Sequence, residues 1–156
     1  MPRSILWVLS IAVATAGLGL AFAGTPENDS ERVKKLATDG AALIAGEGIE
    51  NACKMLRVQN GPYFHGEYYV FVFDFAGVWR CYPPHPEAEG QSIIDLRDPV
   101  DGRPLVRDMI SLAKERGEGW LDYHWTDPVN GKIEIKSTFV KRVPGAELFA
   151  ASGYYH

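Results

Sequence analysis

The side chains that most often perform catalysis or bind metals are scattered along this sequence. Its four histidines lack the spacing of a zinc site and stand at His65, His85, His124 and His156. Asp122 and His124 share one face of a predicted strand, but no serine or cysteine stands in the context of a catalytic triad. The nucleophile elbow, the HExxH motif, the phosphate-binding loop and the CxxCH haem motif are also missing from the sequence. We therefore expect a non-catalytic protein with no metal and no cofactor, and an unrecognised enzyme is the least favoured alternative.

Three aspartates resemble part of a calcium-binding loop. Asp95, Asp98 and Asp101 follow one another at intervals of three residues, whereas the ligands of an EF-hand alternate, and no glutamate closes the set. We expect these carboxylates to cap helices and turns rather than to bind a metal ion.

The two cysteines, Cys53 and Cys81, leave two alternatives open. In an oxidising compartment they can form a disulfide. Two buried free thiols are equally compatible with the sequence, because the residues lie far apart along the chain. Titration of thiols with and without reductant distinguishes the two.

Composition indicates one globular domain with a real core. The chain has 156 residues, of which 46% are hydrophobic and 12% aromatic, so extensive disorder is excluded. Its formal net charge of −4 disfavours a nucleic-acid partner, because binding phosphates requires a basic surface.

Residues 1–23 read as a signal peptide. Arg3 precedes an apolar run from Ile5 to Leu20, and an Ala-x-Ala tripeptide ends at Ala23. Cleavage there would leave residues 24–156 as a periplasmic or secreted domain. A retained N-terminal membrane anchor is the alternative, although the run is short for a full span.

Three segments follow helical patterns. Apolar residues recur at helical spacing from about residue 28 to residue 57, with Gly46 and Gly48 dividing this stretch into a longer and a shorter helix. A third helix is predicted over Pro104–Arg116, with its proline in the first turn.

Five segments rich in aromatic and β-branched residues are typical of strands, and they span Tyr68–Phe73, Val78–Tyr82, Trp120–Trp125, Ile133–Val140 and Leu148–Tyr155. Short turns between consecutive strands favour an antiparallel sheet of about five strands in an α+β fold, extending with its crossover over about 67–155. The first helix would cover one face of the sheet, and the 83–116 crossover would cover the other. A cavity under that crossover is the natural place for a small molecule.

Several motifs occur in a recognisable order, and they are Tyr69–Asp74 with Gly77, Pro83–Pro86, Asp95–Pro104, Gly119–Pro128, Lys136–Lys141 and Ser152–Tyr155. Together they resemble the single Cache domain, the PAS-like extracytoplasmic sensory module of bacterial chemoreceptors and sensor kinases. The resemblance runs from about Val33 to Tyr155. It implies a PAS-like antiparallel sheet with a long N-terminal helix behind it, and a small ligand, often a short carboxylate, between the sheet and a helical crossover.

Two features depart from the family's pattern. Family members often carry a transmembrane helix after the last strand, whereas this sequence stops at His156. A tryptophan commonly follows the Pro-Gly turn, and here Ala146 and Glu147 do. We therefore expect a stand-alone exported protein that serves a membrane-bound sensor kinase, chemoreceptor or transporter.

Lys136 is the first candidate for binding an anionic ligand. The two-residue period of a strand places Lys136 opposite Ile135 and Phe139, and so on the face under the crossover, where its amine can pair with a carboxylate. Arg80, on the partner strand before the proline loop, is the second cation. Candidates for the walls and roof of the pocket are Tyr69, Tyr82, Tyr123, Trp125 and His85. The alternatives are a solvated strand face for Lys136, a surface salt bridge for Arg80, core packing for the aromatic residues and an ordinary loop role for His85.

Two functions follow from these observations. The first is an exported sensory domain, with a place in chemotaxis or other signal transduction, that binds a small organic anion for a membrane partner. The alternative is a non-catalytic structural or interaction subunit of a cell-envelope complex, with a vestigial pocket.

Overall fold

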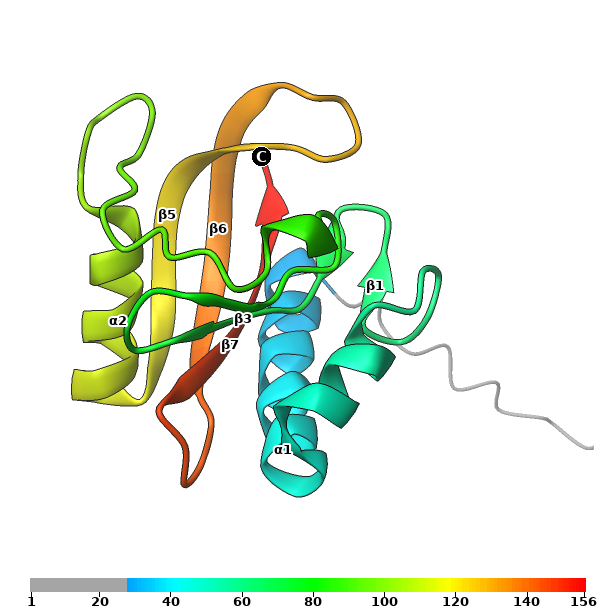
Figure 1. Ribbon diagram of the computed structural model, residues 1–156. Helices are drawn as coiled ribbons and strands as arrows, with labels where there is room; N and C mark the ends of the chain where they lie inside the picture. Colours follow the sequence, from blue (N-terminus) through cyan, green and yellow to red (C-terminus); the bar gives the residue numbers. More distant parts are fainter. Residues whose placement is uncertain (1–27) are drawn as a thin grey trace, which may run out of the picture.

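The computed structural model describes residues 28–156 (Figure 1). The predicted signal peptide, residues 1–23, lies outside these residues. Within the described part of the chain, no helix has the length and apolar character needed to cross a membrane.

The first helix, α1 (Asp29–Leu56), is divided in two. It begins where the Asn28 side chain accepts a hydrogen bond from the amide of Glu31, which caps the first turn. Its helical course is broken at Gly48, whose φ of 76° and ψ of 159° suit a glycine far better than any other residue. The division predicted from the glycines of this stretch is therefore present.

The main sheet has five antiparallel strands in the order β4-β3-β7-β6-β5. The strands are β3 (Phe71–Asp74), β4 (Trp79–Cys81), β5 (Glu118–Thr126), β6 (Ile133–Arg142) and β7 (Leu148–Tyr155). The last strand lies in the centre, between β3 and β6, and β4 and β5 form the two edges. This arrangement confirms the predicted α+β class and the number of strands.

The strand predicted over Tyr68–Phe73 is interrupted at Val70. Tyr68–Tyr69 forms the short strand β2, which pairs with β1 (Phe64–His65) in a separate hairpin. At Val70 the backbone amide leaves the strand pattern and donates to the carbonyl oxygen of Tyr63 at 3.1 Å. The uniformly apolar composition of this segment carries no sign of the break.

A crossover connects β4 to β5 at the opposite edge of the sheet. It contains a short 3₁₀ helix, η1 (Pro86–Ala88), and the helix α2 (Leu105–Arg116). Gly117 ends α2 with a φ of 77°, and its amide donates to the carbonyl oxygen of Ala113. The helices α1 and α2 cover opposite faces of the sheet (Figure 1).

Alternation along the strands divides the core into two layers. On β3 and β7, Phe73 and Phe149 pack toward α2, whereas Val72 and Ala150 pack toward α1. Both layers are apolar, which explains why the central strands are nearly continuous hydrophobic runs. On β6, Phe139 belongs to the layer that faces α1.

Cys53 and Cys81 are joined as a disulfide, with Cα atoms 5.8 Å apart. The bond ties the second segment of α1 to the end of β4, at the edge of the sheet. Of the two alternatives that the sequence left open, the structure has the disulfide.

Candidate functional site

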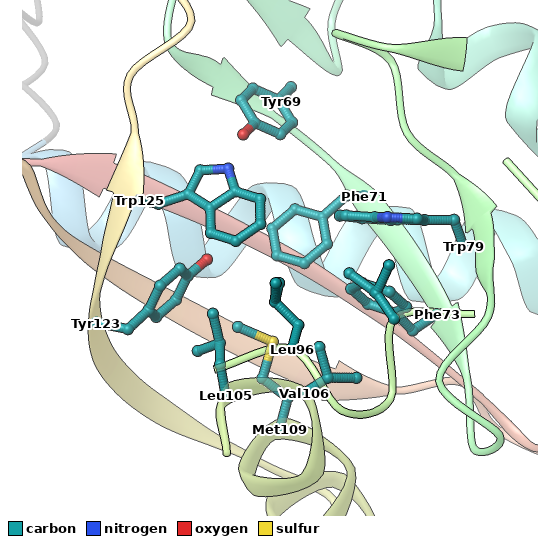
Figure 2. A pocket seen from close by; sticks show the side chains of 11 residues that line it. Tyr69, Phe71, Phe73, Trp79, Leu96, Leu105, Val106, Met109, Tyr123 and Trp125 are labelled. Carbon is teal, nitrogen blue, oxygen red and sulfur yellow. The ribbon is translucent and has the colours of Figure 1, made fainter. Parts of the chain in front are cut away.

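A small cavity lies between the sheet and the crossover (Figure 2). Aromatic side chains of the strands form one side, and aliphatic side chains of the crossover and α2 form the other. The lining residues are Tyr69, Phe71, Phe73, Trp79, Tyr123, Trp125, Ile93, Leu96, Leu105, Val106 and Met109. The lining is mostly apolar, as is usual in sites for small organic molecules.

The positions of these residues follow from local structure. On β3, Phe71 and Phe73 are two residues apart and therefore share the face toward α2. Trp79 stacks on Phe73 with ring centroids 3.9 Å apart. Since Tyr82 stacks on the far side of Trp79 at 4.0 Å, one wall of the cavity is a continuous aromatic stack.

Lys136 places an amine next to this cavity. Its side chain is 1% exposed, and its Nζ donates to the hydroxyl of Tyr69 at 2.8 Å and to that of Tyr155 at 3.3 Å. The Nζ also lies 4.2 Å from the ring centroid of Tyr69 and 4.6 Å from that of Tyr155. Burial lowers the pKa of Lys136 to about 7, because an ammonium group cut off from water is disfavoured.

Neutral phenols surround the amine. Tyr155 donates to the carbonyl oxygen of Thr126 at 2.9 Å, and the hydroxyl of Tyr123 accepts from Thr138 at 3.0 Å. Burial raises the pKa of Tyr69, Tyr123 and Tyr155 well above that of a free phenol. These hydroxyls therefore act as uncharged hydrogen-bonding groups beside the amine.

The Tyr69 hydroxyl links the amine to the cavity. Tyr69 lines the cavity, and Lys136 lies one hydrogen bond behind it. A carboxylate at this end of the cavity would therefore replace the bond between Tyr69 and Lys136. Charge-assisted hydrogen bonds of this kind are about twice as strong as neutral ones.

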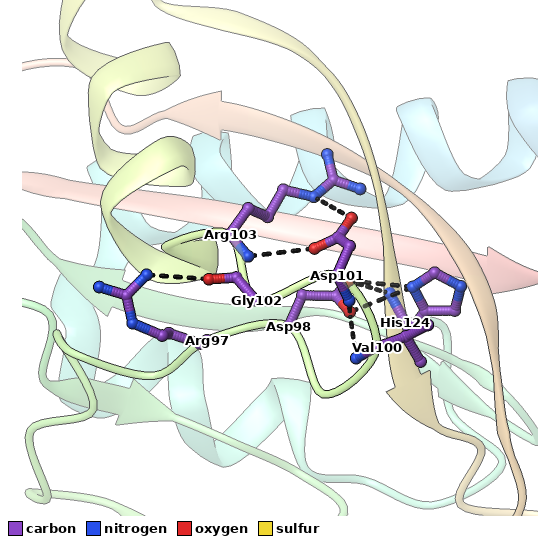
Figure 3. A network of polar contacts seen from close by, with 7 residues as sticks. All are labelled: Arg97, Asp98, Val100, Asp101, Gly102, Arg103 and His124. Atoms are coloured by element: carbon purple, nitrogen blue, oxygen red, sulfur yellow. Dashed lines mark hydrogen bonds and ion pairs between the residues drawn. The ribbon is translucent and has the colours of Figure 1, made fainter.

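Asp98 fastens the crossover to the sheet (Figure 3). Its carboxylate is fully buried and accepts from the backbone amide of His124 at 2.7 Å and from the His124 Nδ1 at 3.1 Å. It also accepts from the amides of Val100 and Asp101, at 2.8 and 3.2 Å. Burial alone would raise the pKa of Asp98, but these hydrogen bonds outweigh it and hold the pKa far below its usual range.

Asp98 and Asp101 have the turn role expected from the sequence, whereas Asp95 is exposed and forms an ion pair with Arg107. Asp101 accepts from the amide of Arg103 at 3.1 Å and forms an ion pair with its side chain (Figure 3). Asp98, Asp101 and His124 offer ligand atoms within 4.8 Å of one another, yet hydrogen bonds already engage the Asp98 carboxylate. Their arrangement positions the loop between Leu96 and Leu105, which both line the cavity.

Four of the seven predicted ligand-binding residues converge at the cavity. Tyr69, Tyr123 and Trp125 line it, and Lys136 lies directly behind Tyr69. Tyr82 is 8% exposed and contributes to the aromatic stack without lining the cavity.

Arg80 and His85 lie outside the cavity, so the ligand roles expected for them are not supported. Arg80 falls at an irregularity in the pairing of β3 with β4, where its side chain is exposed and pairs with Asp74 at 3.5 Å. His85 is exposed, contacts Glu87 at 3.0 Å and lines a separate open groove on the surface. Alternation along β4 directs Arg80 away from the layer that its neighbour Trp79 enters.

Tyr155, Thr138 and Met109 contribute to the site without having been predicted. Lys136 pairs with Tyr155 across β6 and β7, and this register was not available from the sequence. Gly153 makes room for the lysine, because a Cβ at that position would lie 2.7 Å from the Lys136 Cε. The Ser-Gly-Tyr-Tyr motif was therefore a usable signal, since a glycine within a strand often marks a close approach.

Comparison with known proteins points to one family. The sequence profile of the Cache domain matches residues 44–156. The sensor histidine kinase MctS of Rhizobium johnstonii is 32% identical over 87 residues, which cover 56% of this chain and 18% of that protein. The methyl-accepting chemotaxis protein McpP of Pseudomonas putida is 24% identical over 172 residues, covering 99% of this chain and 31% of that protein. The chain thus spans less than a third of the length of these curated relatives.

Solved structures show the same fold. A methyl-accepting chemotaxis protein of Vibrio parahaemolyticus superimposes with a TM-score of 0.68 at 21% identity, over 81% of this chain and 87% of that one. A Cache chemosensory domain that recognises carboxylic acids gives 0.63 at 24% identity, over 78% and 84%. A periplasmic sensor domain of a chemotaxis protein gives 0.63 at 26% identity, over 78% and 85%.

Proposed function

Because the chain belongs to the Cache domain family, we propose that it is an extracytoplasmic sensory domain that binds a short organic anion, a carboxylate, between its sheet and its crossover. In this proposal the bound domain acts on a membrane-bound signalling or transport partner. The domain itself binds and does not catalyse.

One observation carries the proposal, namely a buried amine beside an apolar cavity. Lys136 is 1% exposed and hydrogen-bonds only to phenols among the described residues. A buried cation without an anionic partner is costly, and a carboxylate supplies that partner. The aromatic and aliphatic lining then favours a ligand whose remainder is short and apolar.

The relatives support the same ligand class and the same kind of partner. One similar structure recognises carboxylic acids, and the curated relatives are a sensor kinase and a chemotaxis protein. These are properties of those proteins, and they support the proposal for this chain by similarity.

The geometry on the opposite face of the sheet favours a binding role over catalysis. Ser137 donates to Asp122 at 2.6 Å and contacts the Nε2 of His156 at 2.8 Å. A triad nucleophile instead gives its proton to histidine. Here the hydroxyl proton points to the carboxylate, and the group lies on the face away from the cavity.

A thermal-shift screen near pH 6 tests the proposal. The panel contains acetate, propionate, butyrate, succinate and glycine, and we expect a short monocarboxylate to raise the melting temperature. Lys136→Ala should abolish the shift, whereas Lys132→Ala, an exposed lysine nearby on the chain, should retain it. If no acid of the panel changed the melting temperature at saturating concentration, the result would contradict the proposal and favour a structural subunit.

A further inference from the structure

The site has the features of a proton-linked receptor. We infer that the domain takes up a proton together with its carboxylate, and that the amine of Lys136 receives this proton. The inference rests on the proposed function, because it concerns the same site.

The immediate surroundings of the amine contain no anion. Lys136 is fully buried, and its two hydrogen-bond partners, Tyr69 and Tyr155, are neutral phenols. The ring centroid of Phe71 lies 5.8 Å from the Nζ. Within residues 28–156, no carboxylate forms an ion pair with Lys136.

The carboxylates on the neighbouring elements act on the amine only from a distance. Three tyrosines face the amine, namely Tyr69 from β2, Tyr123 from β5 and Tyr155 from β7. Two carboxylates stand in turns, Glu67 between β1 and β2 and Asp127 between β5 and β6. Glu67 accepts from the amide of Tyr155 at 3.3 Å, and Asp127 accepts from the amide of Val129 at 2.8 Å. Their attraction raises the pKa of Lys136, but burial outweighs it and the pKa falls to about 7.

The ligand supplies the missing charge. In the empty site above neutral pH, the amine has released its proton. When a carboxylate enters, one neutral amine, one proton and one carboxylate become one ammonium–carboxylate pair; an N–H bond forms on Lys136, and the O–H bond that held the proton in hydrated form or in the undissociated acid breaks. The proton comes either from water or with the undissociated acid, and the equilibrium is the same for both routes.

This linkage changes what the sensor measures. Below about pH 7 the amine already holds its proton, so affinity for the anion is independent of pH. Above that value the affinity falls about tenfold for each pH unit, because each binding event must also capture a proton. Occupancy then follows the concentration of the undissociated acid rather than that of the anion.

Isothermal titration calorimetry of the full chain with propionate tests the inference. Titrations at about pH 6 and about pH 8.5 use pairs of buffers that differ in ionisation enthalpy. We expect about one proton taken up per propionate at the higher pH, almost none at the lower pH, and a loss of affinity of more than tenfold between them. Lys132→Met, a control at an exposed lysine, should show the same values as the unaltered chain.

A second measurement follows the amine itself. In protein labelled with ¹³C-lysine, the Lys136 Cε signal is identified by its loss in Lys136→Met. We expect it to titrate near neutral pH in the empty protein and to stay in its protonated position through pH 8.5 when propionate is bound. Binding at both pH values with equal affinity and no proton exchange would overturn the inference alone. Failure of propionate and the other panel acids to bind at about pH 6 would overturn the proposed function as well.

Discussion

At the scale of the residue, the chemistry of the site depends on the environment of Lys136 more than on its residue type. Lysines on strands usually extend into solvent, where their amines remain charged. Here the amine lies among the rings of Tyr69, Tyr155 and Phe71 and has no access to water. In our proposal, the same position therefore serves as an anion receptor and as a proton acceptor.

The buried lysine predicts how stability depends on pH. Between about pH 7 and pH 10 the unfolded chain holds a proton on Lys136 that the folded chain has released, so the free energy of unfolding rises with pH. We expect a slope of up to about 1.4 kcal/mol per pH unit for the empty protein. Urea denaturation at several pH values measures this slope.

Lys136→Met provides the comparison for that slope. The variant has no proton to release, so we expect no rise with pH and greater stability than the unaltered chain near pH 6. If the free energy of unfolding changed with pH in the same way in both proteins, Lys136 would not be uncharged in the empty site and the account would be contradicted.

Part of the site was predictable at this scale. The two-residue period of β6 was sufficient to place Lys136 under the crossover, opposite Phe139. Sequence alone did not reveal that Tyr155 lies across from Lys136, because strand register depends on distant pairing. The expectation for Arg80 also failed, because its neighbour Trp79 enters the cavity layer and alternation along β4 directs Arg80 to the other side.

At the scale of the element, a tether to β5 helps to hold the crossover over the site. Asp98 on the crossover binds the backbone and the ring of His124, at the edge strand of the sheet. The residues on either side of this loop, Leu96 and Leu105, line the cavity. The tether therefore sets the distance between the roof and the floor of the site.

Loss of this tether should weaken both folding and binding. Asp98→Ala removes the acceptor of three backbone amides, and we expect a loss of about 2–4 kcal/mol in stability together with weaker ligand binding. Asp95→Ala, on the same loop, removes an exposed carboxylate paired with Arg107 and should change stability by less than about 1 kcal/mol. Urea denaturation and calorimetry compare the two, and equal effects would contradict the role of Asp98.

The disulfide between α1 and β4 should stabilise the fold independently of the Asp98 tether. It joins residues 28 positions apart, and cross-linking a loop of this length stabilises a fold by about 3–4 kcal/mol. We expect Cys53→Ser with Cys81→Ser to lose this amount, and reductant to destabilise only the unaltered chain. A melting temperature that does not respond to reductant would show that the bond contributes little.

At the scale of the whole molecule, the layers were predictable, whereas the small hairpin was not. Alternating apolar residues and short turns were sufficient to predict a five-stranded antiparallel sheet between helices. The division of Tyr68–Phe73 at Val70 depends on a backbone hydrogen bond to Tyr63, which no local pattern indicates. This division matters because it moves Tyr69 off the main sheet and places its hydroxyl between the cavity and Lys136.

The layered architecture places the cavity in contact with several parts of the fold. The cavity is bounded by the central strands on one side and by α2 on the other. A ligand that displaces the Tyr69 bond to Lys136 therefore contacts the hairpin, the sheet and the crossover at once.

The most direct test of the account is a crystal structure of the chain with the carboxylate that stabilises it most. We expect the carboxylate within hydrogen-bonding distance of the Lys136 Nζ, in place of the present bond to Tyr69, and the apolar end of the ligand directed toward Met109. A ligand bound in the open groove beside His85, with the bond between Lys136 and Tyr69 intact, would contradict the central claim.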